Sequence, residues 1–208
     1  MNNSPLIFGL FLQSSMILAL GAQNIFVLER GLHKDRPFLI AAICSFCDVS
    51  LIMMGVLGAG SYFAQNETLA LILKLAGAAF LFKYAYGKYK EAGKGSNSVV
   101  QESLKHTSLQ TLIFSTLAVS LLNPHVYLDT VILIGGYSTK YPVLEDKINF
   151  ALGAGLFSIL WFFTLSFGAS YFSSTLKKPK AMKVINYGAA FIMSYLGVNL
   201  LLTIIPVI

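Results

Sequence analysis

The sequence contains little charge: Asp, Glu, Lys and Arg make up 12% of its 208 residues, whereas an average soluble domain contains about 25%. It has only two cysteines, Cys44 and Cys47, and both lie inside an apolar run, which excludes a disulfide-rich scaffold. Apolar side chains are abundant instead, at 56%. That content excludes a disordered chain and predicts an integral membrane protein.

Several apolar runs are long enough to cross a bilayer as a helix, which takes about 20 residues. They cover approximately residues 5–28, 37–61, 68–87, 111–136, 148–172 and 184–205. The runs lack the short alternation of apolar and polar residues that marks barrel strands. We therefore expect an all-α integral membrane protein with six transmembrane helices in one membrane domain, 1–208. The start of the chain lacks a positively charged stretch, so we expect the first run to be a retained helix rather than a cleaved signal peptide.

The basic residues between the runs predict the orientation of the helices. The first, third and fifth connections carry three, four and four Lys and Arg residues, whereas the second and fourth carry only Lys140 and Lys147. Positively charged loops stay in the cytoplasm, so we expect the odd loops there and both termini outside. The net charge of +6 is thus explained by topology, and no nucleic-acid partner is predicted.

The two halves of the sequence resemble each other. The string GAAF occurs at 77–80 and again at 188–191, an offset of 111 residues. Three helices per half is an odd number, so the halves would have opposite orientations. We therefore predict two inverted three-helix repeats, about 1–92 and 111–208, joined by a cytoplasmic linker of about 93–110 that is rich in Gly and Ser. The alternative is that Gly and Ala only allow close helix packing.

Runs one and four are each interrupted by polar residues, at 21–24 (GAQN) and at 123–125 (NPH). Paired broken helices in inverted repeats are typical of transporters, with the substrate site near the middle of the membrane. Close packing by small residues accounts for these polar breaks less readily than it does for GAAF.

Asp48 lies about 11 residues into the second run, roughly 16 Å deep in a bilayer core of about 30 Å. A central Asp costs about 2.5 to 3.5 kcal/mol on insertion scales. Such a residue is expected to face an internal cavity and to have a function there. The alternative is a structural Asp bonded to a neighbouring helix, for example to Lys74.

Pro124 removes a helical hydrogen bond and disfavours helical geometry at Asn123, which predicts a kink in run four. His125 and Asp129 are four residues apart and would share a face after that kink. Such a pair could bind a cation or relay a proton, because imidazole titrates near neutral pH. Alternatively, His125 and Asp129 only satisfy each other.

Gly21, Gln23 and Asn24 interrupt run one close to its cytoplasmic end. If the helix unwinds there, the free N–H groups at the start of the second half-helix would suit a carboxylate. The alternative is a cluster of amides at the membrane interface.

Cys44 and Cys47 form a C-x-x-C pattern, which leaves open a membrane thiol–disulfide electron carrier. Cysteine is also a common small residue in packed helices. A divalent-metal exporter that uses Asp48, Asp129 and His125 is a further alternative. The sequence has no phosphate loop, nucleotide fingerprint or Ser-His-Asp ordering, so neither an enzyme nor a bound cofactor is predicted.

The segments NPHVYLDT (123–130) and GAQN (21–24) resemble motifs of the LysE-type lysine/arginine exporter family, in particular its basic-amino-acid exporter branch. The likeness runs nearly end to end and includes CSFCD (44–48) and ALG (151–153). The resemblance implies an exporter of L-arginine and L-lysine in a bacterial inner membrane, driven by an ion gradient and working without a partner subunit.

Combined with this resemblance, the residues predict a substrate site. Asp48 and Asp129 would neutralise the cationic groups of the substrate and would also take up the protons that compete with it. His125 and Asn123 would orient these groups. The α-carboxylate of the substrate would be bound at the break in run one, by Gly21, Gln23 and Asn24. Protons and lipid are then the other partners, and the small-residue helix faces are compatible with a homodimer.

Overall fold

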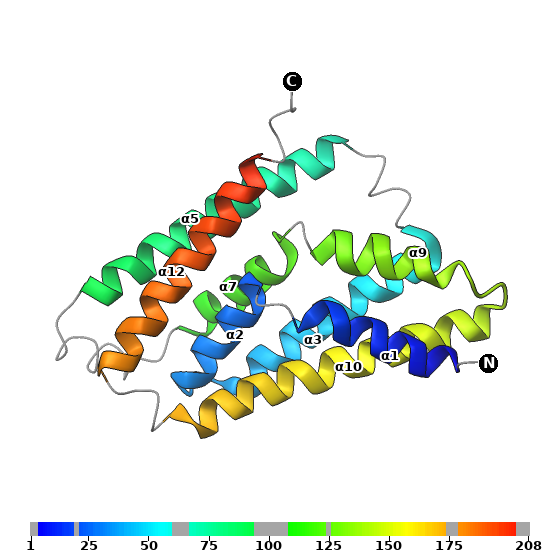
Figure 1. The fold of residues 1–208 in the computed structure, drawn as a ribbon, viewed down its shortest axis with the longest axis horizontal. Helices are drawn as coiled ribbons and strands as arrows, with labels where there is room; N and C mark the ends of the chain where they lie inside the picture. The colour runs from blue at the N-terminus through cyan, green and yellow to red at the C-terminus, as the bar shows by residue number, and fades with distance from the viewer. Residues whose placement is uncertain are drawn as a thin grey trace.

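The computed structural model describes residues 4–18, 21–59, 67–93, 108–123, 126–173 and 179–202, and the regular secondary structure in these ranges is helical throughout (Figure 1). The elements are α1 (Pro5–Ile17), α2 (Ala22–Leu32), α3 (Pro37–Met54), η1 (Gly55–Ala59), α5 (Glu67–Gly93), α7 (Leu109–Leu121), η2 (Tyr127–Ile134), α9 (Gly135–Ser138), α10 (Leu144–Tyr171) and α12 (Pro179–Leu202). The predicted all-α fold is confirmed for the described residues.

The first apolar run is broken, as predicted. α1 ends at Ile17, α2 begins at Ala22, and the axes of the two helices differ by 80°. Gly21 precedes α2 in an extended conformation, with φ −86° and ψ 174°. Gln23 and Asn24 already belong to the first turn of α2. The break therefore lies before the two amides rather than across them, because helical geometry resumes directly after Gly21.

The fourth run is also interrupted. α7 ends at Leu121 and η2 begins at Tyr127, whereas Pro124 and His125 lie outside the described residues. From Tyr127 the chain forms a π-helix, a rare geometry that occurs often at functional sites. This π-helix was not predicted, because a π-helix has no clear residue pattern. The kink in η1 after α3, where Gly58 has a φ of 103°, was not predicted either.

Glycines let η2 and the end of α3 approach each other. A Cβ on Gly55 would lie 2.6 Å from the carbonyl oxygen of Val131, and a Cβ on Gly135 would lie 2.6 Å from that of Gly55. Real side chains do not come so near to a backbone oxygen, so only glycine fits both positions. η2 is thereby held against the end of α3.

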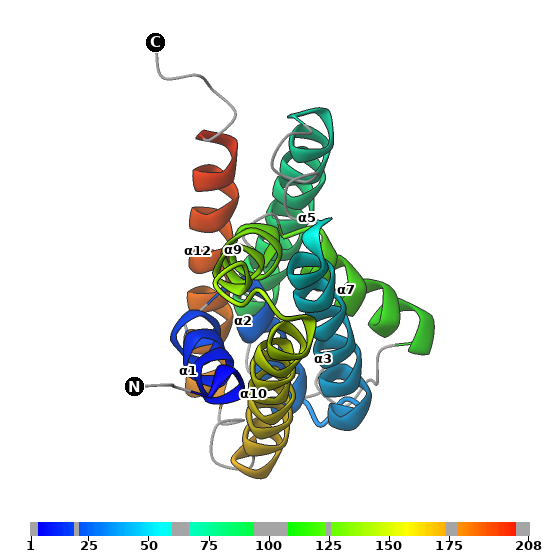
Figure 2. The ribbon, with the colours of Figure 1, turned by 90° about the vertical axis from the view of Figure 1, so that its right-hand side faces the viewer.

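α10 packs along α1, and both views show the two helices side by side (Figure 2). A Cβ on Gly9 would lie 2.0 Å from the carbonyl oxygen of Phe150, and a Cβ on Gly153 would lie 1.9 Å from that of Leu6. α10 also contacts α2. It therefore supports both halves of the broken first run.

α5 and α12, which carry the two GAAF strings, lie side by side (Figure 1). A Cβ on Gly77 would lie 2.2 Å from the carbonyl oxygen of Leu122, at the end of α7. A Cβ on Gly188 would meet no atom within 4 Å. Close packing therefore explains the glycine of the first string but not that of the second, and the inverted repeat stays a prediction.

Among the described residues, three helical stretches are long and apolar enough to cross a membrane, and the bent pair α1 and α2 would make a fourth. The three are Pro37–Gly58, Leu144–Tyr171 and Lys183–Leu202. α7 is shorter, at 13 residues. α5 continues to Gly93, beyond the end expected near residue 87. Six complete spans therefore remain a prediction.

Large aromatic side chains are exposed on the outside of the helices, which suits a lipid environment and not water. Their exposed fractions reach 81%. The most exposed are Phe46, Phe114, Tyr171 and Phe191.

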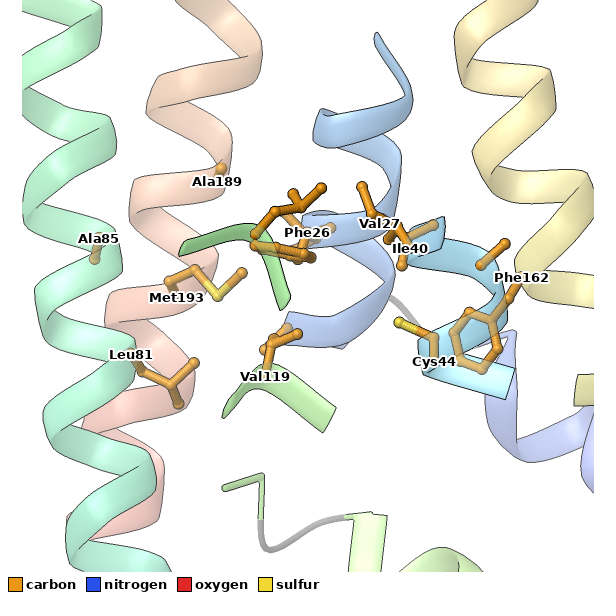
Figure 3. Packing of buried hydrophobic residues seen from close by; sticks show 14 of the residues in the cluster. Phe26, Val27, Ile40, Cys44, Leu81, Ala85, Val119, Phe162, Ala189 and Met193 are labelled. Carbon is orange, nitrogen blue, oxygen red and sulfur yellow. The ribbon is translucent and has the colours of Figure 1, made fainter. Parts of the chain in front are cut away.

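α2 lies in the middle of the main apolar core (Figure 3). Its Phe26 is on the side of Met193 from α12, whereas Val27 is on the side of Ile40 from α3. Phe26, Val27, Met193 and Ile40 are all fully buried. The core thus holds the middle of α2 firmly and leaves its first turn to line the functional site.

Candidate functional site

A cavity of about 300 Å³ lies where α1, α2, α3, α5, η2 and α12 meet. This volume is at the lower end of the range for small-molecule sites, roughly 300 to 1,000 Å³. The predicted site residues that fall in the described part of the chain all line it: Gly21, Gln23, Asn24, Asp48, Asn123 and Asp129. Residues that are far apart in the sequence are thus brought together around one space.

The cavity carries two carboxylates, one from each half of the chain. Asp48 lies on α3 and is 4% exposed, and Asp129 lies on η2 and is half-buried. They occupy the same cavity rather than separate pockets. Two acidic side chains in a space of this size suit a ligand with a net positive charge.

Asp48 is held by side chains from two neighbouring helices. Its Oδ2 accepts a hydrogen bond from Gln13 Nε2 of α1, at 3.0 Å, and a short one from the Ser158 hydroxyl of α10. Gln13 Nε2 also donates to Ser158 Oγ at 2.8 Å. The alternative of a helix-linking Asp is therefore correct in part, with an amide and a hydroxyl as partners, but the same residue also lines the cavity.

Gln23 and Asn24 fix the broken helix in place. Gln23 Nε2 donates to Ser120 Oγ of α7 at 3.1 Å. Asn24 Nδ2 donates to the carbonyl oxygen of Ile17 at 2.6 Å, and its Oδ1 accepts from Trp161 Nε1 at 3.1 Å. The bond to Ile17 satisfies a carbonyl at the end of α1, where no helical donor remains. Both amides are thus engaged with the protein.

One side of the cavity is formed by residues on both sides of the predicted kink. Asn123 and Asp129 line it together with Thr130, whose hydroxyl donates to the carbonyl oxygen of Val126. The roles predicted for Pro124 and His125 stay predictions, since both residues lie outside the described part of the chain.

Sequence reasoning missed several polar residues of this region, among them Gln13, Ser158 and Asn199. Gln13 and Asn199 each interrupt an apolar run, which is a usable but weak signal for a lining residue. Ser158 gave no signal, because serine is common in packed membrane helices.

Cys44 and Cys47 are free and buried. Cys44 Sγ accepts a hydrogen bond from Ser120 Oγ at 3.7 Å. Within the described ranges, no group of three or more His, Cys, Asp or Glu side chains is placed to hold a metal ion. His125, which the metal-export alternative requires, is outside those ranges.

A second polar cluster lies at the other end of α2. Glu29 accepts a hydrogen bond from Lys88 Nζ of α5 at 2.5 Å and another from the Tyr84 hydroxyl. Lys88 also pairs with Glu91 at 2.6 Å. Glu29 is 2% exposed and Lys88 is 5% exposed, so this is a buried ion pair that joins α2 to α5.

Apolar helices long enough to cross a membrane, packed around a cavity with two acids, are typical of a multi-pass membrane transporter. The chain belongs to the family of LysE type translocators, whose family model matches residues 14–203.

The relatives agree with this class. A putative amino-acid transporter of Aeromonas salmonicida, YggA, is 34% identical over 192 residues, which are 92% of this chain and 93% of that protein. The arginine exporter protein ArgO of Escherichia coli strain K12 is 34% identical, and that of Klebsiella pneumoniae strain 342 is 35% identical. Each of these two matches covers 92% of this chain and 90% of the exporter. No solved structure matches the chain.

Proposed function

We propose that this protein exports L-arginine and L-lysine across the bacterial inner membrane in exchange for protons, by alternating access. One observation carries the proposal: Asp48 and Asp129, from opposite halves of the sequence, line the same cavity of about 300 Å³. The related proteins named as arginine exporters support the choice of substrate.

The charges of the cavity fit a basic amino acid. Such a substrate has two cationic groups and one carboxylate, so two acids and one anion-binding element would balance it. Asp48 and Asp129 supply the acids. Asn123 and His125 would orient the bound substrate, as the sequence predicts.

The first turn of α2 would bind the α-carboxylate. Gly21 caps this helix and lines the cavity, and the first N–H groups of any helix have no intrahelical acceptor. Helix N-termini also attract negative charge. The side chains of Gln23 and Asn24 already bond to Ser120 and Ile17, so the backbone N–H groups are better placed for this role than the amide side chains.

Protons would supply the driving force. Moving one positive charge out against an interior-negative potential costs about 2.3 kcal/mol per 100 mV. Protonation of Asp48 or Asp129 would remove the attraction that holds the substrate. Proton and amino acid would then compete for one site, which produces antiport.

The packing of the helices is compatible with rocking of two inverted repeats. In the first half, the first helix contributes α1, which packs on α10 of the second half. In the second half, α7 and η2 take the place of that first helix, and both contact α3 of the first half. α5 and α12, the third helix of each half, pack on each other. The odd loops would face the cytoplasm, and a homodimer stays a prediction.

Arginine counterflow in liposomes that contain only the purified chain tests the proposal. Vesicles loaded with unlabelled arginine should accumulate external labelled arginine, and lysine should compete with it. An outward arginine movement that accelerates with an inward proton gradient would support antiport. Vesicles that show no counterflow above protein-free liposomes would contradict the proposed function.

Replacing Cys44 and Cys47 together by Ser separates the exporter from a thiol carrier. An exporter should keep arginine counterflow within about twofold, because both thiols are buried and neither faces the cavity. A thiol–disulfide electron carrier would lose all activity, since the thiolate is the reacting group. Complete loss of arginine flux in a variant that still folds would contradict the expectation that the two thiols have no part in transport.

A further inference from the structure

Three buried polar residues meet beside the cavity, and each comes from a different helix. Gln13 of α1 is 2% exposed, Asp48 of α3 is 4% exposed and Ser158 of α10 is fully buried. Gln13 and Asp48 line the cavity, and Ser158 lies behind them. A fully connected polar cluster at such depth fixes its members in one arrangement.

The two partners of Asp48 donate to the same oxygen. Gln13 Nε2 and the Ser158 hydroxyl both bond to Oδ2, so neither of them uses Oδ1. A carboxylate has about four positions at which it can accept a hydrogen bond. The arrangement therefore holds the plane of the carboxylate and leaves its second oxygen for another donor.

One polar atom of Gln13, its amide oxygen Oε1, has no hydrogen-bond partner in the described part of the structure. Its Nε2 donates to both Asp48 and Ser158, which uses both amide hydrogens. Its Oε1 is buried and accepts no hydrogen bond in the described part of the structure. A buried acceptor without a partner is unfavourable, and a donor from a ligand beside Asp48 would satisfy it.

We infer that Ser158 positions Asp48 for the cationic group of the substrate, an ammonium or guanidinium. Gln13 has two roles, because its amide nitrogen positions Asp48 and its amide oxygen binds the same cation. This inference rests on the proposed function. Ser158 and the amide nitrogen of Gln13 orient Asp48 through Oδ2. The bound cation donates to Oδ1 of Asp48 and to Oε1 of Gln13, so the two acceptors define its position.

The test measures arginine affinity by calorimetry on the purified full-length protein, together with KM and maximal rate in liposomes. Gln13→Met keeps the length of the side chain and removes both amide atoms, and Ser158→Ala removes only the hydroxyl. Each should weaken arginine binding by about tenfold, through a higher KM with a maximal rate close to wild type. The double variant should weaken binding by less than the product of the two single effects, because Gln13 and Ser158 bond to each other and to the same oxygen of Asp48.

Ser166→Ala is the matched control. Ser166 is also a fully buried serine of α10, but its hydroxyl donates to the carbonyl oxygen of Pro37 at 2.9 Å, and Ser166 does not line the cavity. This variant should leave arginine affinity unchanged. A general loosening of α10 would instead lower affinity in both serine variants.

The outcomes separate this inference from the proposed function. Wild-type affinity in both Gln13→Met and Ser158→Ala, while Asp48→Asn no longer binds arginine, would overturn the positioning role and leave the export function intact. No arginine binding to the wild-type protein would contradict the proposed function itself. If Gln13→Met does not fold, Ser158→Ala and its control decide the matter alone.

Discussion

Asp48→Asn should abolish arginine transport and leave the protein folded. The substitution keeps the shape of the side chain and removes its charge. Truncating one partner of a buried charge pair costs about 2 to 5 kcal/mol, which corresponds to a loss of roughly 30-fold to several thousand-fold in affinity. Counterflow with purified protein in liposomes would measure the loss, and size-exclusion chromatography would verify folding.

Asp146→Asn supplies the matched control for charge. Asp146 is in the first turn of α10 and does not line the cavity. Its substitution removes the same charge from the protein, so arginine flux should stay within about twofold of wild type, as for most substitutions away from special sites. Full flux in Asp48→Asn would refute the substrate site proposed above.

Lys88→Met should destabilise the protein strongly. Lys88 and Glu29 form a buried ion pair with a nitrogen-to-oxygen distance of 2.5 Å. Removing one partner of such a pair leaves an unpaired buried charge and costs about 3 to 5 kcal/mol. For a chain of this length, that loss lowers the midpoint of thermal unfolding by roughly 6 to 20 °C, which a melting curve in detergent would detect.

Lys90→Met, on the same helix, is the control for this second prediction. Lys90 is exposed, so its loss should move the melting temperature by no more than a few degrees. Combining Lys88→Met with Glu29→Gln should recover part of the lost stability, because the unpaired charge is then gone. Equal melting temperatures for Lys88→Met and Lys90→Met would show that the pair does not join α2 to α5.

Charge in an apolar run was the strongest guide from the sequence. The cost of burying Asp48 predicted an internal cavity, and the structure places this acid beside one. The break before α2 was predictable because Gly and two amides interrupt a long apolar run. In both cases the free-energy cost of placing a charged or polar group in an apolar environment limits the structures that the chain can adopt.

The partners of these residues could not be predicted in the same way. Gln13 and Asp48 are 35 residues apart and Asp48 and Ser158 are 110 apart, and the packing of α10 on both α1 and α3 brings them together. Glu29 and Lys88 are 59 residues apart on helices whose pairing has no periodic signature. The close packing of η2 against the end of α3, at Gly55 and Gly135, involves residues outside η2, so the sequence of η2 alone could not predict it.

The most direct test of the account is a distance between bound arginine and Asp48. Solid-state NMR on protein in lipid, with ¹⁵N-labelled arginine and ¹³C-labelled aspartate carboxyl groups, would detect this contact. We predict a coupling that matches a direct ion pair, with nitrogen and carboxylate oxygen within about 4 Å, and its loss in Asp48→Asn. Arginine that binds to the protein without any coupling to Asp48 would contradict the central claim.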